Sequence, residues 1–132
     1  MEDLIKQNLT KQEIIDVKIQ ITILESKLIE NIGNKIAIVG SGGTLVALNK
    51  NSLNTMTLDN FSTGWRGAIV AEEFINNGYF VVYLCRSNCA KPFQRKFMKA
   101  DITQISQHIG MMQLSQDRIH IIKFKFVFEY LH

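Results

Sequence analysis

The chain has 132 residues, of which 46% are hydrophobic and 20% are charged. We therefore expect one domain over residues 1–132, and the composition excludes disordered and fibrous classes. Apolar runs of only a few residues and the acidic start at Glu2 and Asp3 argue against a membrane span or a signal peptide. The net charge is +3, with most cations in the second half. We expect a cytoplasmic protein with no membrane partner.

A first helix is predicted from Thr10, because Thr10 and Glu13 have the spacing of a capping box. Apolar residues then recur at helical spacing and stop before Asn31 and Gly33: Ile14, Val17, Ile21, Leu24 and Leu28. An alternating pattern typical of a strand overlaps them, at Val17, Ile19, Ile21 and Ile23. The prediction is a helix, with a strand as the alternative.

The rest of the chain alternates between strand and helix patterns. Strands are predicted at residues 35–39, 79–84 and 118–126. Helices are predicted from residue 60 to Asn77-Gly78, over residues 101–112, and from residue 127 onward. This order predicts the α/β class, with a mainly parallel Rossmann-like sheet and flanking helices. Ligands in such sheets bind beyond the carboxyl ends of the strands.

Two glycine-rich segments follow this rule. Gly40-Ser41-Gly42-Gly43-Thr44 directly follows the first predicted strand, so its backbone N–H groups could face an anion. The segment lacks the full P-loop and GxGxxG patterns, and a plain tight turn is the alternative.

The second glycine-rich segment opens the second predicted helix. Ser62, Thr63, Gly64 and Gly67 are expected in its first turn, where unpaired N–H groups favour an anion. Arg66 adds a permanent positive charge suited to phosphate or carboxylate. The structural alternative makes Ser62 a helix cap and Gly67 a packing glycine.

Cysteine and histidine provide no metal motif. Cys85 and Cys89 have no partners at zinc-like spacing, and His108, His120 and His132 are scattered. We expect no metal site, a reducing intracellular setting and a buried free thiol at Cys85.

A cluster of cations without an acidic residue among them could attract phosphates or form a solvated loop: Arg86, Lys91, Arg95, Lys96 and Lys99. No nucleic-acid reading motif accompanies this cluster, so we expect no nucleic-acid partner.

A longer pattern includes both glycine-rich segments. It comprises Ser41-Gly42-Gly43-Thr44, then Asp59-Asn60-Phe61-Ser62-Thr63-Gly64-x-Arg66-Gly67-Ala68, then Ala71-Glu72-x-Phe74 with Gly78-Tyr79, and finally Val82-x-Leu84-x-Arg86. With the later Pro92-Phe93 and Phe126–Leu131 segments, this pattern resembles eukaryotic phosphopantothenoylcysteine synthetase, also called phosphopantothenate–cysteine ligase.

The resemblance implies a ligase of coenzyme A biosynthesis. Such an enzyme joins phosphopantothenate to cysteine through an acyl-nucleotidylate formed with ATP or CTP and Mg²⁺, and acts as a homodimer. By position, Gly42 and Gly43 would line the nucleotide, and Ser62, Gly64 and Gly67 would hold its phosphates. Asn60 would bind phosphopantothenate, and Arg66 would lie near phosphate groups. No catalytic residue is assigned.

The sequence departs from the family pattern in three places. Met56 stands where the family usually has an arginine that meets the neighbouring subunit's substrate, and Val46-Ala47-Leu48 lacks the usual proline. The later Ala-Ala-x-Ser-Asp segment is absent, so the fold is expected to be incomplete relative to the family. A non-catalytic nucleotide-binding or assembly module is therefore the alternative function. An NAD(P)-binding domain using Asp59 fits poorly, because no clear strand pattern precedes Asp59.

Overall fold

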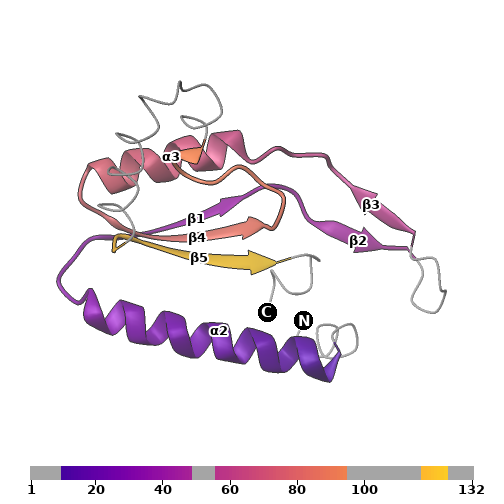
Figure 1. The fold of residues 1–132 in the computed structure, drawn as a ribbon, viewed down its shortest axis with the longest axis horizontal. Coiled ribbons are helices and arrows are strands. Elements are labelled where there is room, and N and C mark those ends of the chain that lie inside the picture. Colours follow the sequence, from indigo (N-terminus) through magenta and orange to yellow (C-terminus); the bar gives the residue numbers. More distant parts are fainter. Residues whose placement is uncertain (1–9, 49–55, 95–116, 125–132) are drawn as a thin grey trace, which may run out of the picture.

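The computed structural model describes residues 10–48, 56–94 and 117–124 (Figure 1). These residues form two helices and five strands: α2 (Lys11–Glu30), β1 (Ile36–Ser41), β2 (Leu45–Ala47), β3 (Thr57–Asp59), α3 (Trp65–Asn76), β4 (Phe80–Arg86) and β5 (Ile119–Phe124). The predicted helices at 101–112 and from residue 127 lie outside the described residues.

Three strands form one parallel sheet in the order β1, β4, β5. Tyr83 on the central strand β4 is in register with Val39 on β1 and with Ile121 on β5. Helix α3 packs against β1 and β4, whereas α2 contacts β5, and the two helices lie on opposite sides of the sheet (Figure 1). The predicted α/β class with a mainly parallel sheet is therefore confirmed.

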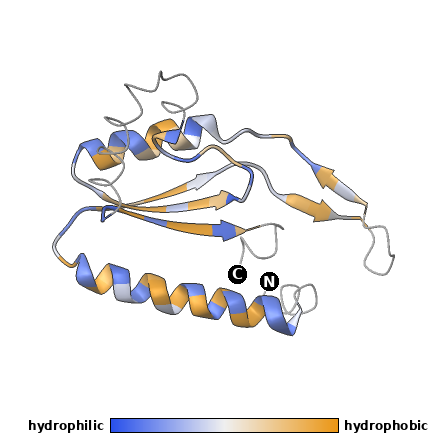
Figure 2. Cartoon of the chain, viewed as in Figure 1, coloured by the Kyte–Doolittle hydropathy of each residue, from blue (hydrophilic) through white to orange (hydrophobic). Residues whose placement is uncertain are grey.

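Helix α2 begins with the predicted capping box. The Glu13 N–H donates to Thr10 Oγ1 at 3.3 Å, and the Thr10 N–H donates to Glu13 Oε2 at 2.6 Å. The helix ends at the cap residue Asn31, so the strand alternative for this segment is wrong. None of its residues is buried, and Figure 2 shows hydrophobic residues interspersed with hydrophilic ones along it. Local capping determines where this helix starts, while its packing is loose.

Helix α3 is better buried but begins later than the sequence predicted. Its cap is Gly64, which has φ of +78° and makes no side-chain capping bond, and the first helical residue is Trp65. Ser62 and Thr63 therefore precede the helix, and the interpretation of Ser62 as a helix cap is wrong. A left-handed cap residue disfavours a side chain, which explains the glycine at this position. At the other end, Gly78 has φ of +81° and ends the helix as predicted.

A short antiparallel hairpin, β2–β3, extends from the parallel sheet (Figure 1). Its register pairs Leu45 with Asp59, and the Leu48 N–H donates to the Met56 carbonyl at 2.8 Å. The sequence analysis missed this hairpin, because strands of three residues are too short to produce a clear alternating pattern. The sequence shows no well-formed strand before Asp59, but in the structure the three-residue strand β3 ends at this residue.

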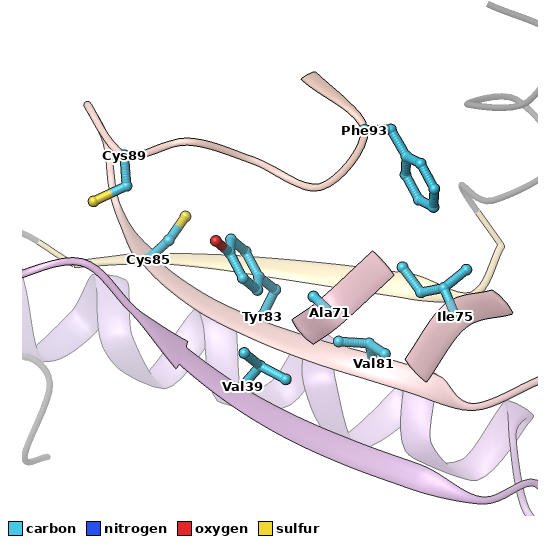
Figure 3. Close-up of a cluster of buried hydrophobic side chains, with 8 residues drawn as sticks. All are labelled: Val39, Ala71, Ile75, Val81, Tyr83, Cys85, Cys89 and Phe93. Carbon is cyan, nitrogen blue, oxygen red and sulfur yellow. The ribbon is translucent and has the colours of Figure 1, made fainter. Parts of the chain in front are cut away.

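The hydrophobic core lies between α3 and the β1–β4 part of the sheet (Figure 3). Its members come from β1, α3, β4 and the segment after β4: Val39, Ala71, Ile75, Val81, Tyr83, Cys85, Cys89 and Phe93. Both cysteines are free and buried, which confirms the prediction for Cys85. Burial also raises the pKa of the Cys85 thiol, and nearby Cys89 adds to that effect.

Within the described ranges, neither helix is long and apolar enough to span a bilayer. The cytoplasmic location expected from the sequence stays a prediction.

Because the core includes α3 but not α2, substitutions in the two helices should differ in how far they lower the free energy of unfolding. Ile75 of α3 is 3% exposed, whereas Ile29 of α2 is 67% exposed. We expect Ile75→Ala to lower the free energy of unfolding by about 2–5 kcal/mol, because it leaves a cavity in the core. The matched control Ile29→Ala should change that energy by only about 0.5 kcal/mol. Urea denaturation of the two variants measures both, and equal losses would contradict the described core.

Candidate functional site

A cleft of about 420 Å³ opens where β1 ends and α3 begins. Its lining comes from β1, the loop before α3 and the first turns of α3: Val39, Gly40, Ser41, Gly42, Ser62, Thr63, Gly64, Trp65, Arg66, Gly67 and Val70. The volume lies within the range of small-molecule sites. This position, at the carboxyl end of a parallel strand, is where ligands bind in open α/β sheets.

Most of the predicted site residues lie together in this cleft. Gly42, Ser62, Gly64, Arg66 and Gly67 all line it, and Arg66 is exposed on the first turn of α3. The cleft therefore combines the start of a helix, which carries partial positive charge, with a guanidinium. This arrangement favours a phosphate or carboxylate ligand.

The remaining two predicted residues, Gly43 and Asn60, lie beside the cleft and against each other. A Cβ added at Gly43 would overlap the Asn60 side-chain amide. The sequence predicts that Gly43 lines the nucleotide, which would leave the space of the missing Cβ to the ligand. In the structure the Asn60 side chain occupies that space, so Gly43 is required for a protein contact.

Ser41 joins the two sides of the cleft. Its buried hydroxyl donates to the Gly64 carbonyl at 2.9 Å, and the same carbonyl accepts the first backbone bond of α3 from the Ala68 N–H at 3.0 Å. A Cβ added at Gly67 would overlap Ser41, which supports the packing interpretation of Gly67. Sequence reasoning gave Ser41 no role, since a single serine after a glycine carries no signal of its partner.

The loop before α3 is shaped by two side chains that bond to its own backbone. Asp59 Oδ1 accepts from the Phe61 N–H at 3.0 Å, and Asn60 Oδ1 accepts from the Ser62 N–H at 3.2 Å. Phe61 has a left-handed φ of +53°, which a non-glycine residue adopts only when its surroundings require it. The loop is therefore held in one particular turn.

The segment after β4 is hydrogen-bonded to this loop. The Ala90 N–H donates to the Thr63 carbonyl at 2.9 Å, and Tyr83 Oη donates to the Ala90 carbonyl at 2.9 Å. Cys89 occupies the space beside Gly42 that a Cβ would need, and its Cβ would lie 3.0 Å from one added at Gly64. The floor of the cleft is thus tightly packed.

Glu72 anchors the far end of the same segment. It is 4% exposed in α3, and its Oε1 accepts from the Phe93 N–H at 2.7 Å. Phe93 has a left-handed φ of +63°. The helical pattern identified α3, but it could not show which backbone group this buried carboxylate would meet.

An ion pair lies at the rim of the loop. Arg86 Nη1 is 2.6 Å from Asp59 Oδ1, and each side chain is 17% exposed. The guanidinium, followed by the Phe61 N–H, holds the pKa of Asp59 below its usual value. The predicted cationic cluster is therefore partly neutralised at Arg86. Its members Arg95, Lys96 and Lys99 lie outside the described residues.

The same ion pair bears on the NAD(P) alternative. That reading requires the Asp59 carboxylate to accept from a ribose hydroxyl, but in the structure it accepts from Arg86 and Phe61. The structure gives the NAD(P) reading no support.

A second cavity of about 330 Å³ shares Thr63 and Trp65 with the cleft. Its other lining residues follow β4 and include a cation: Ser87, Asn88, Cys89, Ala90, Lys91 and Gln94.

The fold and the cleft together define an α/β protein with an anion-favouring site at the carboxyl end of β1. No protein-family model matches the chain. Over 64 residues it is 47% identical to phosphopantothenate–cysteine ligase Cab2 of Saccharomyces cerevisiae, covering 48% of this chain and 17% of that protein. The human phosphopantothenate–cysteine ligase is 43% identical over 65 residues, covering 49% of this chain and 20% of that protein.

Solved structures extend the likeness to nearly the whole chain. A Cab2 mutant in complex with phosphopantothenate-cysteine matches with a TM-score of 0.60 at 28% identity, covering 98% of this chain and 44% of that chain. A second Cab2 mutant structure matches with a TM-score of 0.60 at 29% identity, covering 91% of this chain and 44% of that one. The chain is therefore a homologue of phosphopantothenate–cysteine ligases, as its motifs indicated. It spans less than half the length of the relatives it matches.

Because Ser41 lies against Gly67, an alanine at position 67 is expected to destabilise the protein, although alanine usually stabilises a helix relative to glycine. Replacing glycine by alanine inside a helix normally stabilises it by about 1 kcal/mol. We expect Gly67→Ala instead to lower the free energy of unfolding by about 1–3 kcal/mol, because the new Cβ overlaps Ser41. Adding Ser41→Gly should restore part of the loss. Stabilisation by the single substitution, measured by urea denaturation, would contradict this close approach.

Burial of Tyr83 predicts a loss of stability at alkaline pH. Burial raises the pKa of Tyr83 to about 12, above the value of 10 for an exposed tyrosine. The neutral phenol therefore contributes its full stability below pH 10, and that contribution falls as the pH rises through the folded pKa. Tyr83→Phe should reduce the decline in unfolding free energy between pH 9 and 11.5 more than Tyr79→Phe does. An identical decline in both variants would count against this assignment.

Proposed function

We propose that this chain binds the triphosphate of ATP or CTP in the cleft between β1 and α3 and takes part in joining phosphopantothenate to cysteine. The observation that carries the proposal is homology to phosphopantothenate–cysteine ligases over about half of the chain. The Cab2 structure in complex with phosphopantothenate-cysteine supports the same substrate class, because its fold covers 98% of this chain.

The proposed reaction has two steps. The carboxylate of phosphopantothenate attacks the α-phosphorus, the bond to the departing pyrophosphate breaks, and an acyl-nucleotidylate forms. The amine of cysteine then attacks the activated carbonyl, loses a proton and displaces the nucleoside monophosphate. Both steps depend on positioning and charge neutralisation rather than on a protein nucleophile.

The residues of the cleft have chemistry suited to these demands. We assign the phosphates to Ser62, Gly64 and Gly67, where the first N–H groups of α3 open into the cleft. Arg66 is exposed on the same turn and would neutralise phosphate charge. Gly42 lines the cleft and Gly43 lies beside it, on the side that we assign to the rest of the nucleotide.

Asn60 is the proposed contact to phosphopantothenate. Its Oδ1 accepts from the Ser62 N–H, which orients the side chain at the edge of the cleft. An amide carries two N–H donors as well as its oxygen, so Nδ2 could donate to a substrate oxygen while Oδ1 keeps its bond to Ser62.

Magnesium would bind as a complex with the nucleotide triphosphate. Among residues 10–48, 56–94 and 117–124, no three His, Cys, Asp or Glu side chains group together to hold a metal ion. An ion bound mainly through substrate phosphate oxygens fits this arrangement, because Mg²⁺ at nucleotide sites is usually held in that way.

A homodimer is part of the proposal. The β2–β3 hairpin carries large hydrophobic side chains that are more than half exposed, namely Leu48, Met56 and Leu58. A second copy covering this hairpin would remove that apolar surface from water. At position 56 this chain has an uncharged methionine where the family usually has an arginine that meets the neighbouring subunit's substrate.

The alternative is a non-catalytic module that binds a nucleotide or assembles with another chain. It is favoured by the chemistry of the cleft, which suits an anion whether or not a reaction follows. A single assay separates the two functions. The protein is incubated with ATP or CTP, Mg²⁺, phosphopantothenate and cysteine, and pyrophosphate release is measured. Release supports the ligase, whereas a nucleotide-induced thermal shift without release supports the module. A shift with NADH and none with ATP or CTP contradicts both.

Gly64 provides a specific test of the nucleotide site. We expect Gly64→Val to abolish the thermal shift caused by ATP or CTP, because the new Cβ would lie 3.0 Å from Ser41 Oγ and from Cys89 Cβ and would displace the start of α3 that borders the cleft. Gly78→Val is the matched control, since Gly78 also has a left-handed φ, of +81°, but lies at the other end of α3 in open space. The control carries a similar backbone strain and should retain the shift. An undiminished shift in Gly64→Val would refute this placement.

A further inference from the structure

The ion pair between Asp59 and Arg86 links the hairpin to the parallel sheet through side chains. Asp59 is the last residue of β3, and Arg86 is the last residue of β4. Their atoms Oδ1 and Nη1 are 2.6 Å apart, with both side chains 17% exposed. The limited exposure of both side chains reduces solvent screening of this pair.

The pair acts on the loop that carries the proposed substrate contact. The Asp59 oxygen that receives Arg86 also accepts from the Phe61 N–H at 3.0 Å. Asn60 lies between these two residues and packs against Gly43. Movement of Asp59 would therefore shift the Asn60 amide relative to the cleft.

The other end of this loop has separate supports. The Thr63 carbonyl accepts from Ala90, and the Gly64 carbonyl accepts from Ser41. These bonds hold the residues next to α3, where the phosphates are proposed to bind. The ion pair thus supports the Asn60 end of the loop, together with the β2–β3 pairing of Asp59 with Leu45.

We propose that Asp59 and Arg86 form a positioning pair that holds Asn60 in place to bind phosphopantothenate. The inference rests on the proposed function, since it assigns to these two residues the orientation of the substrate contact. Arg86 acts through Asp59 and touches no reacting atom. Neither residue belongs to the hydrophobic core cluster, so the pair can be changed with little effect on the core.

Three substitutions distinguish the effect of the Asp59–Arg86 ion pair from the effect of the Asp59–Phe61 hydrogen bond that shapes the loop. Arg86→Met removes the guanidinium, and Arg86→Lys keeps a charge but loses the planar group. Asp59→Asn keeps an oxygen that can accept from Phe61 while removing the negative charge. Lys27→Met is the control, because it removes a cation from the exposed Lys27–Glu30 pair of α2, whose N–O distance is 3.1 Å.

The first measurement is the affinity for phosphopantothenate and, separately, for the nucleotide, by titration calorimetry. We expect Arg86→Met and Asp59→Asn to weaken phosphopantothenate binding about tenfold or more, the size of one lost hydrogen bond. Nucleotide affinity should change less, and Arg86→Lys should recover part of the loss. A purely structural role would instead weaken both ligands together. Unchanged phosphopantothenate affinity in Arg86→Met, or equal losses for both ligands, would overturn the proposal.

The second measurement needs no ligand, so it tests the positioning pair independently of the proposed function. Hydrogen exchange reports the Phe61 and Ser62 N–H groups, whose bonds to Asp59 and Asn60 define the loop. We expect faster exchange at both in Arg86→Met and no change in Lys27→Met. If the unaltered protein bound no phosphopantothenate, the proposed function would fail, and unchanged exchange in Arg86→Met would separately reject the positioning pair.

Discussion

The site depends on the close approach of α3 to the end of β1. The Ser41 hydroxyl donates to the Gly64 carbonyl, and this contact is possible only because Gly67 has no side chain to push the helix away. The approach brings the first turn of α3 against the end of the edge strand β1, where Val39 and Ser41 are buried. The cleft follows from that contact, and so does the position of the exposed Arg66 in its lining.

The loop between the hairpin and α3 receives support from two strand ends and from the segment after β4. Ser41 at the end of β1 holds Gly64, Arg86 at the end of β4 holds Asp59, and Ala90 holds Thr63. Each support contributes a modest free energy, but together they select one conformation for a segment without regular structure. A site that must position a carboxylate against a phosphorus atom benefits from such rigidity.

The glycines of the two glycine-rich segments lie against side chains of the protein itself. The sequence predicts that Gly42 and Gly43 line the nucleotide, and it leaves Gly67 open between a phosphate contact and packing. The structure instead places Cys89 beside Gly42, Asn60 beside Gly43 and Ser41 beside Gly67. These residues are needed first for packing of the protein against itself. A glycine pattern reveals that something approaches closely, but it does not say whether that neighbour is a ligand or a side chain.

The sequence by itself determined the α/β class, the limits of α2 and the resemblance to the ligases, because capping boxes, periodicity and contiguous motifs are local properties of the chain. Only the tertiary structure decided that Arg86 pairs with Asp59, that Glu72 receives the Phe93 N–H and that a hairpin precedes the loop. Arg86 and Asp59 are separated by 27 positions and Glu72 and Phe93 by 21, so no local pattern links them. Their partners were set by the parallel pairing of β1 with β4 and by the packing of α3 on that pair.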